Sequence, residues 1–331
     1  MHFFKIKDTE QNKSERHIWL DTLLTLLTLE VMAYFYYGLH SAALAVVCLA
    51  SSMAAEFVCL RLMNRPFTAD GLTVTTDALI ISMMLPAVFD YAPAAIACVF
   101  TVTAAKNIFG GRWNMIFSPA AAAYIFLYTS WKGQLLLFQQ PHDTVGILGS
   151  TDSLVNSASH VFNTTGKFNY TGFELIMGNF PGPAGSVCIL MLLIAAVILL
   201  FRRDISAGAF MGTMIGYAVM SAISPCAETF AASLKLSVCT NMVLFSAIYI
   251  ISDRRIAPQK NYYAVFYGFF IAVVAYVITV TSAKENAIVI VSVLFTPVAL
   301  GLKNLEKKIE LAKQDDMKSA KAVKEVPADV Q

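Results

Sequence analysis

Ten apolar stretches, each about long enough to cross a membrane as a helix, follow one another along this 331-residue chain. A helix that spans the hydrocarbon core needs about 20 apolar residues, because every backbone N–H and C=O must be satisfied internally where water is absent. Hydrophobic residues make up 57% of the chain and charged residues only 14%. Ordinary soluble domains carry roughly 25% charged residues. The sequence therefore predicts an all-α polytopic membrane protein with about ten transmembrane helices.

Short clusters of Lys and Arg lie between the apolar stretches and indicate an orientation. Loops on the cytoplasmic side are enriched in Lys and Arg. With the N-terminus inside, every cluster falls on the cytoplasmic side, and both termini are predicted there, in a bacterial inner membrane. The predicted spans are 18–38, 40–60, 74–89, 92–109, 116–131, 184–201, 207–223, 231–251, 261–281 and 285–302. The clusters are Arg61 and Arg65, Lys106 and Arg112, Arg202 and Arg203, Arg254, Arg255 and Lys260, and the tail from Lys303.

The remaining segments complete a five-part organisation. No small-residue cleavage site follows the basic N-terminus, so we expect a retained first span instead of a removed signal peptide. A Ser-, Thr-, Asn- and Gly-rich loop is predicted outside the membrane, and a charged helix that frays into disorder is predicted at the C-terminus. The parts are residues 1–17, the cytoplasmic N-terminus; 18–131, a first five-helix repeat; 132–183, the external loop; 184–302, a second five-helix repeat; and 303–331, the cytoplasmic tail.

A faint internal repeat supports the division into two halves. Residues 76–83, TDALIISM, resemble residues 240–247, TNMVLFSA, which begin 164 residues later. Five predicted helices separate the copies, and an odd number inverts the orientation. The halves would then be related by a pseudo-two-fold axis in the membrane plane, as in many transport folds that bind their substrate near the midplane.

The most distinctive segment is residues 106–120, KNIFGGRWNMIFSPA. Gly110 and Gly111 allow a sharp turn or a close approach to a ligand, and Arg112 offers positive charge to an anion. Pro119 is suited to the first turn of the next helix. The alternative interpretation is a tight cytoplasmic turn whose charges set only the topology.

This segment also carries a resemblance to a known family. Residues 76–131, with Leu85-Pro86, Phe109-Gly110-Gly111, Asn114 and 117–120, resemble the membrane-embedded D subunit of the Rnf electron-transport complex. They are similarly close to the B subunit of the sodium-translocating NADH:quinone reductase. Glu56 before the Arg61/Arg65 turn, residues 177–182 (MGNFPG) and residues 252–258 (SDRRIAP) extend the resemblance over most of the chain. The resemblance implies a fold of two inverted five-helix repeats.

The resemblance further implies a flavoprotein subunit of a redox-driven ion pump. In the family, FMN is joined through its phosphate to a threonine of a Ser-Gly-Ala-Thr motif in the external loop, and riboflavin can bind noncovalently. The matching residues here are Asn156-Ser157-Ala158-Ser159, so Ser159 would carry FMN, with serine in place of the family's glycine at Ser157. Thr151, Thr164 and Thr165 are alternative acceptors, and Gly110, Gly111, Arg112 and Asn114 are candidate cofactor-binding residues.

Acidic residues within membrane spans are candidates for an ion pathway, because a charge at midspan costs about 2.5–3.5 kcal/mol on insertion scales. The candidates chosen on this ground are Glu56, Asp77 and Glu228. The six cysteines stand singly, and the histidines lack metal-site spacing, so we expect no metal. A net charge of +2 without a basic face gives no reason to expect nucleic acid as a partner.

Two functions follow from these features. The first is a flavoprotein subunit of an Rnf-like complex, which passes electrons through flavin and couples them to sodium or proton movement. Its partners would be the other membrane and cytoplasmic subunits of that complex. The alternative is a small-solute transporter or channel-like protein with the same inverted repeats and no redox activity. No independent catalytic motif is present in the sequence.

Overall fold

The computed structural model describes residues 2–64, 69–108, 115, 117–143, 145–147, 149 and 153–324. Nearly all of its regular structure is helical. The elements are α1 (His2–Tyr37), α2 (Leu39–Leu62), η1 (Ala69–Leu72), α3 (Thr73–Met84), α4 (Tyr91–Phe100), the π-helical η2 (Thr101–Asn107), α5 (Pro119–Ser130), α6 (Lys132–Leu135), β1 (Leu137–Phe138), β2 (Val155–Asn156), α7 (Ala158–Thr165), α8 (Gly172–Met177), α9 (Ile189–Phe201), α10 (Ala207–Ile223), α11 (Phe230–Cys239), α12 (Val243–Ser246), the π-helical η4 (Ala247–Ile251), α13 (Asn261–Ser282), α14 (Ala287–Leu294) and α15 (Thr296–Lys324).

Each predicted apolar stretch is largely helical, but few of the helices are long and straight. Among the described residues, three helices are long and apolar enough to cross a membrane: Arg16–Tyr37, Leu39–Leu62 and Asn261–Ser282. The number rises to five if two bent pairs each count as one span, α11 with α12–η4 and α14 with α15. The bends are 61° and 44°. A membrane protein is thus supported, and a count of ten spans stays a prediction.

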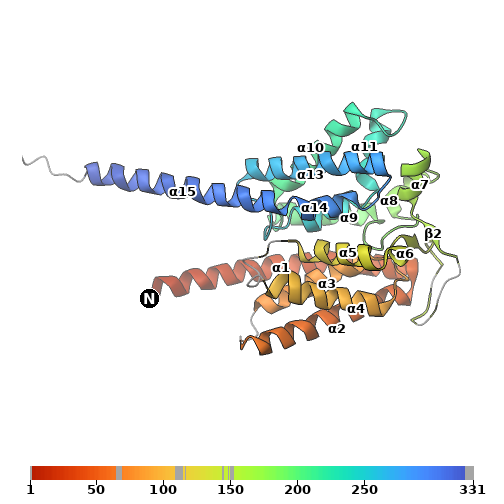
Figure 1. Ribbon diagram of the computed structural model, residues 1–331, viewed down its shortest axis with the longest axis horizontal. Helices are drawn as coiled ribbons and strands as arrows, with labels where there is room; N and C mark the ends of the chain where they lie inside the picture. Colours follow the sequence, from red (N-terminus) through yellow and green to blue (C-terminus); the bar gives the residue numbers. More distant parts are fainter. Residues whose placement is uncertain are drawn as a thin grey trace, which may run out of the picture.

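The helices form two groups that follow the two halves of the sequence (Figure 1). Helices α1 to α5 make one group, and α9 to α15 make the other. The groups meet where α1 packs on α9 and α5 packs on α14. The start of α1 and the end of α15 project from the same end of the molecule, whereas α7, α8 and β2 lie at the opposite end (Figure 1).

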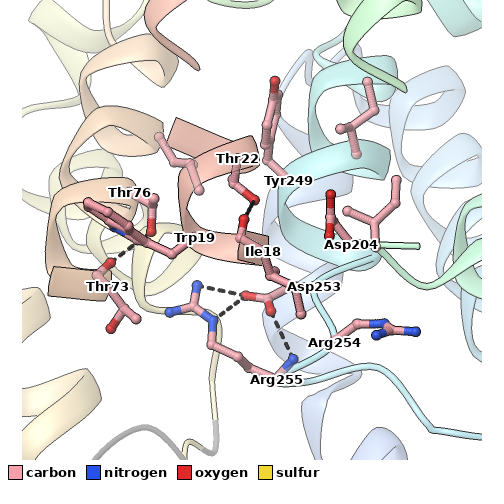
Figure 2. A pocket seen from close by; sticks show the side chains of 13 residues that line it. Ile18, Trp19, Thr22, Thr73, Thr76, Asp204, Tyr249, Asp253, Arg254 and Arg255 are labelled. Atoms are coloured by element: carbon pink, nitrogen blue, oxygen red, sulfur yellow. Dashed lines mark hydrogen bonds and ion pairs between the residues drawn. The ribbon is translucent and has the colours of Figure 1, made fainter. Parts of the chain in front are cut away.

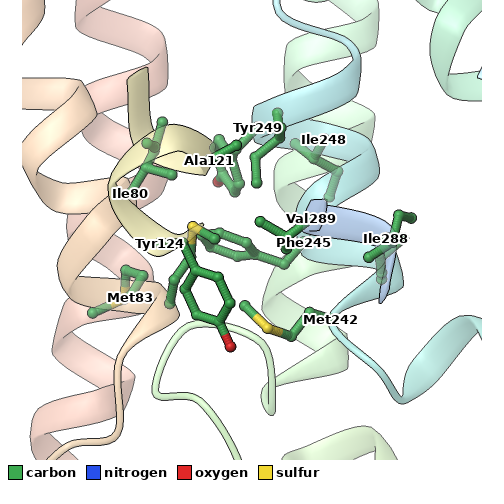
Figure 3. Close-up of a cluster of buried hydrophobic side chains, with 14 of the residues drawn as sticks. Ile80, Met83, Ala121, Tyr124, Met242, Phe245, Ile248, Tyr249, Ile288 and Val289 are labelled. Atoms are coloured by element: carbon green, nitrogen blue, oxygen red, sulfur yellow. The ribbon is translucent and has the colours of Figure 1, made fainter. Parts of the chain in front are cut away.

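A buried apolar core joins the two groups (Figure 3). From the first half, Ile80 and Met83 of α3 face this core, and from the second half Phe245 and Ile248 do so. Every residue of α12 and η4 is buried, as are all but one of α3, so these are the central elements of the molecule. The long apolar faces of α1 and α2, in contrast, are exposed, as expected for surfaces that meet lipid.

Helices α10 and α13 pack unusually closely, because small residues line their contact. A Cβ added at Gly212 would lie 2.2 Å from the carbonyl oxygen of Val265, and one added at Gly268 would lie 2.2 Å from that of Ala209. Small residues at such spacing let two membrane helices approach until their backbones touch. The second half is therefore built around this helix pair.

The helix predicted over 231–251 is broken in the middle. Asn241 and Met242 have positive φ angles of 56° and 57°, which separate α11 from α12. Left-handed backbone is unfavourable for residues with side chains and persists only where surrounding contacts hold it. The break falls within residues 240–247, which resemble residues 76–83 in sequence, and Asn241 aligns there with Asp77.

The segment 132–183 contains regular structure that the sequence analysis did not predict. It forms α6, α7, α8 and a two-residue antiparallel pair in which Leu137 opposes Asn156 and Phe138 opposes Val155. A capping box at Thr171 and Glu174 starts α8. The C-terminal helix α15 continues to Lys324, so the charged tail is helical through the described residues.

Candidate functional site

A cavity of about 90 Å³ lies between the two halves, near the end from which α1 and α15 project (Figures 1 and 2). Trp19 and Thr22 of α1 and Thr76 of α3 line it from the first half. Tyr249 of η4 and Asp204, in the turn between α9 and α10, line it from the second half. A cavity of this size has room for a few water molecules beside its polar side chains.

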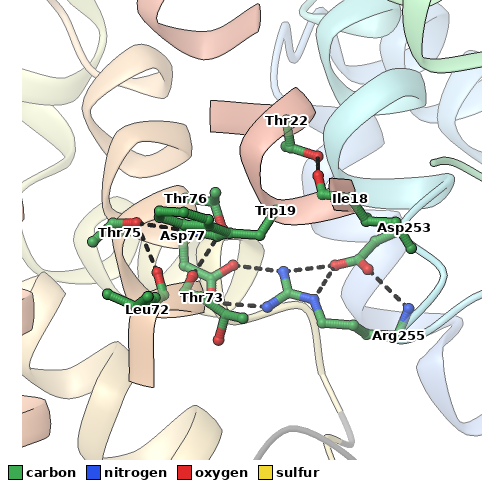
Figure 4. Close-up of polar contacts among 10 residues, drawn as sticks. All are labelled: Ile18, Trp19, Thr22, Leu72, Thr73, Thr75, Thr76, Asp77, Asp253 and Arg255. Carbon is green, nitrogen blue, oxygen red and sulfur yellow. Dashed lines mark hydrogen bonds and ion pairs between the residues drawn. The ribbon is translucent and has the colours of Figure 1, made fainter. Parts of the chain in front are cut away.

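Arg255 lines this cavity, and its ion pairs connect the first half of the chain to the second (Figure 4). Its guanidinium donates to both carboxylate oxygens of Asp77, at 2.6 and 3.0 Å, and to Asp253 at 2.7 Å. Burial alone would lower the pKa of Arg255, but Asp253 and Asp77 raise it well above its ordinary value. Asp77, predicted as an ion-pathway residue, is therefore held by a fixed cation in a bidentate pair.

Asp204 lines the same cavity and forms no ion pair among the described residues (Figure 2). It is 6% exposed, and its Oδ2 has no hydrogen-bond donor among the described residues. The adjacent Asp21 is paired with Arg202 at 2.6 Å. Burial and the charge of Asp21 raise the pKa of Asp204 to about 6. A carboxyl group with such a pKa can take up a proton near neutral pH.

Glu56, the second predicted ion-pathway residue, is also neutralised by a fixed partner. Lys106 donates to one carboxylate oxygen at 2.7 Å, and Asn107 donates to the other at 2.9 Å. The Glu56 and Lys106 side chains are each only 3% exposed. The π-helical turn η2 places Lys106 and Asn107 next to each other on the face toward α2. This pair stabilises the first half from within.

Glu228, the third predicted residue, lies apart from the other two. It is exposed in the segment that connects α10 and α11, outside any helix. The structure therefore places Asp77 at the junction of the halves, Glu56 inside the first half and Glu228 at the surface, and it does not bring the three together.

Ser159, the predicted flavin acceptor, is buried, which corrects the expectation of an exposed loop. It lies in the first turn of α7 and is 7% exposed. Its Oγ accepts a hydrogen bond from the backbone N–H of Asn241, at 3.0 Å, and Asn163 donates to the Asn241 side chain at 2.6 Å. These two hydrogen bonds hold α7 against the break between α11 and α12, and we call this its seated position. Thr164 and Thr165, at the other end of α7, are exposed.

A phosphate-linked flavin does not fit at Ser159 while α7 is seated. The hydroxyl oxygen already accepts a backbone N–H, and the side chain is almost fully covered. A phosphoester at this oxygen would have to displace α7 from Asn241. Among the other candidates, the exposed hydroxyls of Thr164 and Thr165 have open surroundings. Gly110, Gly111, Arg112, Asn114 and Thr151 lie outside the described residues.

Sequence reasoning missed the acidic residues without a counter-cation. Asp204 and Glu285 lie in turns that the hydropathy pattern marks only as span boundaries, and Glu30 lies within the first apolar span. Glu285 is 5% exposed and accepts a hydrogen bond from Ser157, the residue that caps α7. A signal was available, since each is an isolated acid in or beside an apolar stretch, as are Glu56 and Asp77. Within the described part of the chain, no three His, Cys, Asp or Glu residues gather as a metal site would require.

Comparison with known proteins finds similarity to proteins named as subunits of ion-translocating oxidoreductase complexes. The D subunit of the Na⁺-translocating ferredoxin:NAD⁺ oxidoreductase complex of Acetobacterium woodii is 25% identical over 194 residues, covering 58% of this chain and 60% of that protein. The B subunit of the Na⁺-translocating NADH-quinone reductase of Yersinia pestis is 29% identical over 150 residues, covering 44% and 36%. The D subunit of an ion-translocating oxidoreductase complex of Shewanella amazonensis is 30% identical over 141 residues, covering 41% and 40%.

These alignments cover between 36% and 60% of the relatives' own lengths. The family model reaches further along this chain. The model described as the NQR2, RnfD, RnfE family matches residues 8–302, which include every element from α2 to α14, most of α1 and the Arg255 junction between the halves. The chain therefore belongs to the NQR2, RnfD, RnfE family.

Proposed function

We propose that this chain is the membrane flavoprotein subunit of an Rnf-like electron-transport complex, in which electron flow through flavin drives sodium or proton movement. The observation that carries the proposal is the family match over residues 8–302, which spans both halves of the helical bundle. The relatives reported above are named as subunits of ion-translocating oxidoreductases. The partners are accordingly the other membrane and cytoplasmic subunits of such a complex.

The proposed architecture is ten transmembrane segments in two inverted five-helix repeats, with both termini in the cytoplasm of a bacterial inner membrane. Two features support it. The helices group by sequence half, and the start of α1 and the end of α15 project from one end while α7 and α8 lie at the other (Figure 1). Arg202 pairs with Asp21 of α1, Arg254 lines the cavity beside Trp19 of α1, and Lys303 of α15 donates to the carbonyl oxygen of Arg255. These basic residues thus gather beside α1 and α15, as the positive-inside rule requires of a cytoplasmic face.

FMN, attached to a hydroxyl of the segment 132–183, and a noncovalent riboflavin are the proposed cofactors. Bound flavin would supply reversible uptake and release of electrons. The contribution of this chain is to fix the position of the attachment segment and to shield it from water. Ser159 is the first proposed acceptor, because Ala158 followed by a hydroxyl matches the family's motif. Since the hydroxyl is buried, attachment there requires α7 to leave its seat on Asn241.

For the ion, we propose a route along the junction between the halves. Its cytoplasmic part is the cavity beside Asp77, where the Oδ2 of Asp204 has no hydrogen-bond donor among the described residues. Most of the cavity lining is apolar, and the side-chain oxygens of Thr22, Thr76 and Asp204 are groups there that suit a hard cation such as sodium or a water that carries a proton. In this route Asp77 shapes the cavity through Arg255, whereas Glu56 stabilises the first half, and Glu228 has only its exposed position to support a role.

Covalent flavin in this chain tests the proposal. We expect the chain, co-expressed with the neighbouring subunits and a flavin transferase, to give a fluorescent flavin band in a denaturing gel. Mass spectrometry of the 132–183 peptides should locate the flavin. Ser159→Ala should abolish the band, and Ser159→Thr should keep or raise it. The paired variants Thr164→Ala and Thr165→Ala, on the exposed end of the same helix, are matched controls that should leave it unchanged.

Ser159→Ala also has a stability cost that the control variants lack. The substitution leaves the buried N–H of Asn241 without its acceptor, and a buried unsatisfied donor costs about 1–3 kcal/mol. Folded yield must therefore be measured alongside fluorescence, and Ser159→Thr retains the acceptor. A band that survives Ser159→Ala but disappears with Thr164→Ala or Thr165→Ala would move the attachment site to the end of α7. No flavin in any variant would contradict covalent attachment.

A solute transporter or channel is the second candidate function. The broken helix at Asn241 and the cavity between the halves favour it, because transporters build binding sites from interrupted helices at a repeat interface. Flavin content separates the two candidates. A complex that contains neither covalent nor noncovalent flavin after gentle purification would support the transporter.

A further inference from the structure

The buried carboxylates of this chain fall into two classes. Glu56 and Asp77 have fixed cationic partners, Lys106 and Arg255, at 2.7 and 2.6 Å. Glu285 is equally buried, at 5% exposed, yet among the described residues no Lys, Arg or His lies within ion-pair distance of its carboxylate. A buried carboxylate without a counter-charge must be protonated or must bind a cation from solution.

The surroundings of Glu285 are built from three separate elements. Glu285 lies in the turn between α13 and α14, outside both helices. The Ser157 hydroxyl, at the start of α7, donates to its Oε2 and accepts from the backbone N–H of His160 at 2.9 Å. The Tyr124 side chain, on α5, lies close enough to Glu285 to interact electrostatically with its carboxylate. It also contacts the Asn286 side chain.

The neighbouring Asn286 shows that the polar groups here are not fully satisfied by the protein. It is 1% exposed, its side chain contacts Tyr124, and its Nδ2 makes no hydrogen bond of ordinary geometry within the described part of the chain. A buried amide without a partner is costly, so such groups usually bind water or a ligand. The site therefore combines an acid without a counter-charge and hydroxyl oxygens, which can bind a cation, with an amide N–H that can donate to water or to the carboxylate, at the end of the molecule opposite the cavity beside Asp77 (Figure 1).

We propose that Glu285, together with Ser157, forms an exchangeable monovalent-cation site, for a proton or for Na⁺, at the external end of the junction between the halves. Its place in an ion route rests on the proposed function, whereas cation binding itself does not. The Ser157 bond links occupancy of this site to the seating of α7. Exchange of the cation and the position of the loop that contains Ser159 are therefore coupled.

The direction of the pH dependence follows from the burial of Glu285. Burial disfavours the charged form of the carboxyl group, and the bond from Ser157 acts in the opposite direction because it stabilises the carboxylate. The titratable groups of the elements that meet here are Tyr124 on α5, His160 on α7 and the exposed Lys284 in the same turn. At low pH Glu285 holds a proton, and at higher pH the bare carboxylate requires Na⁺ or water.

Infrared difference spectroscopy of the purified complex, titrated through neutral pH with and without NaCl, tests the site. We expect a protonated-carboxyl band in wild type that is lost in Glu285→Gln. The matched control Glu174→Gln changes a partly exposed acid of the same external segment and should leave the band intact. Ser157→Ala retains Glu285 and should move the midpoint of the band to higher pH, because the stabilising donor is gone.

The NaCl arm distinguishes the two cations. A midpoint that moves to lower pH as Na⁺ is added identifies a site where Na⁺ and protons compete, and an unmoved midpoint identifies a proton site. A band that persists in Glu285→Gln, or a Ser157→Ala midpoint that does not move, would overturn the proposal. The infrared measurement requires neither flavin nor electron transfer, so its failure is distinguishable from failure of the proposed function.

Discussion

Arg255→Ala is expected to destabilise the junction between the halves by about 3–5 kcal/mol, the range found when one partner of a buried ion pair is removed. The reason is that Asp77, with a side chain only 4% exposed, would keep its charge without the guanidinium that now binds both of its oxygens. The measurement is the temperature or denaturant midpoint of the purified protein, together with the yield of folded chain.

Two further variants separate loss of the pair from loss of an arginine in general. Arg254→Ala removes the neighbouring arginine, which is exposed in the same turn, and should have little effect. Asp77→Asn introduced into Arg255→Ala should recover part of the loss, because the uncompensated charge is removed. If Arg255→Ala were as stable as Arg254→Ala, the pair would not hold the halves together.

Gly212→Leu is expected to prevent close packing of α10 on α13 and to remove most of the folded protein. Even a Cβ at this position would lie 2.2 Å from the carbonyl oxygen of Val265, and backbone cannot move aside as a side chain can. Overpacking a core typically costs about 1–3 kcal/mol and sometimes more. We expect the upper end of that range or beyond, since two helices must separate along their length.

The matched control for this substitution is Gly301→Leu. Gly301 is also helical, in α15, but a Cβ there meets nothing within 4 Å. Detergent-solubilised yield and thermal aggregation temperature should fall for Gly212→Leu and stay near wild type for Gly301→Leu. Equal behaviour of the two variants would show that the contact between α10 and α13 tolerates separation.

The apolar pattern predicted where helices form but not where they break. Each predicted stretch contains a helix, because burial of backbone polar groups in lipid leaves helices as the accessible structure. The break at Asn241 and Met242 depends on the distant Ser159, which accepts the Asn241 N–H. No local pattern at 240–242 contains that information, since both residues are compatible with a continuous helix.

The candidate site was only partly predictable for the same reason. Glu56 and Asp77 are conspicuous as acids in apolar sequence, but their partners lie 50 and 178 residues away. Whether a buried acid is neutralised by a fixed cation or left to bind an exchangeable one is decided by these tertiary contacts. The polar composition of the segment around Ser159 likewise predicted exposure, whereas contacts with Asn241 and Glu285 bury it.

Redox-driven cation uptake by the reconstituted complex tests the central claim most directly. The complex, with this subunit present or omitted, is sealed into vesicles, and Na⁺ and pH in the lumen are followed after an electron donor is added. The account predicts cation movement that starts with the donor, accompanies flavin reduction and is lost when this subunit is omitted. Cation or solute movement that proceeds at the same rate without donor, in a preparation free of flavin, would contradict it.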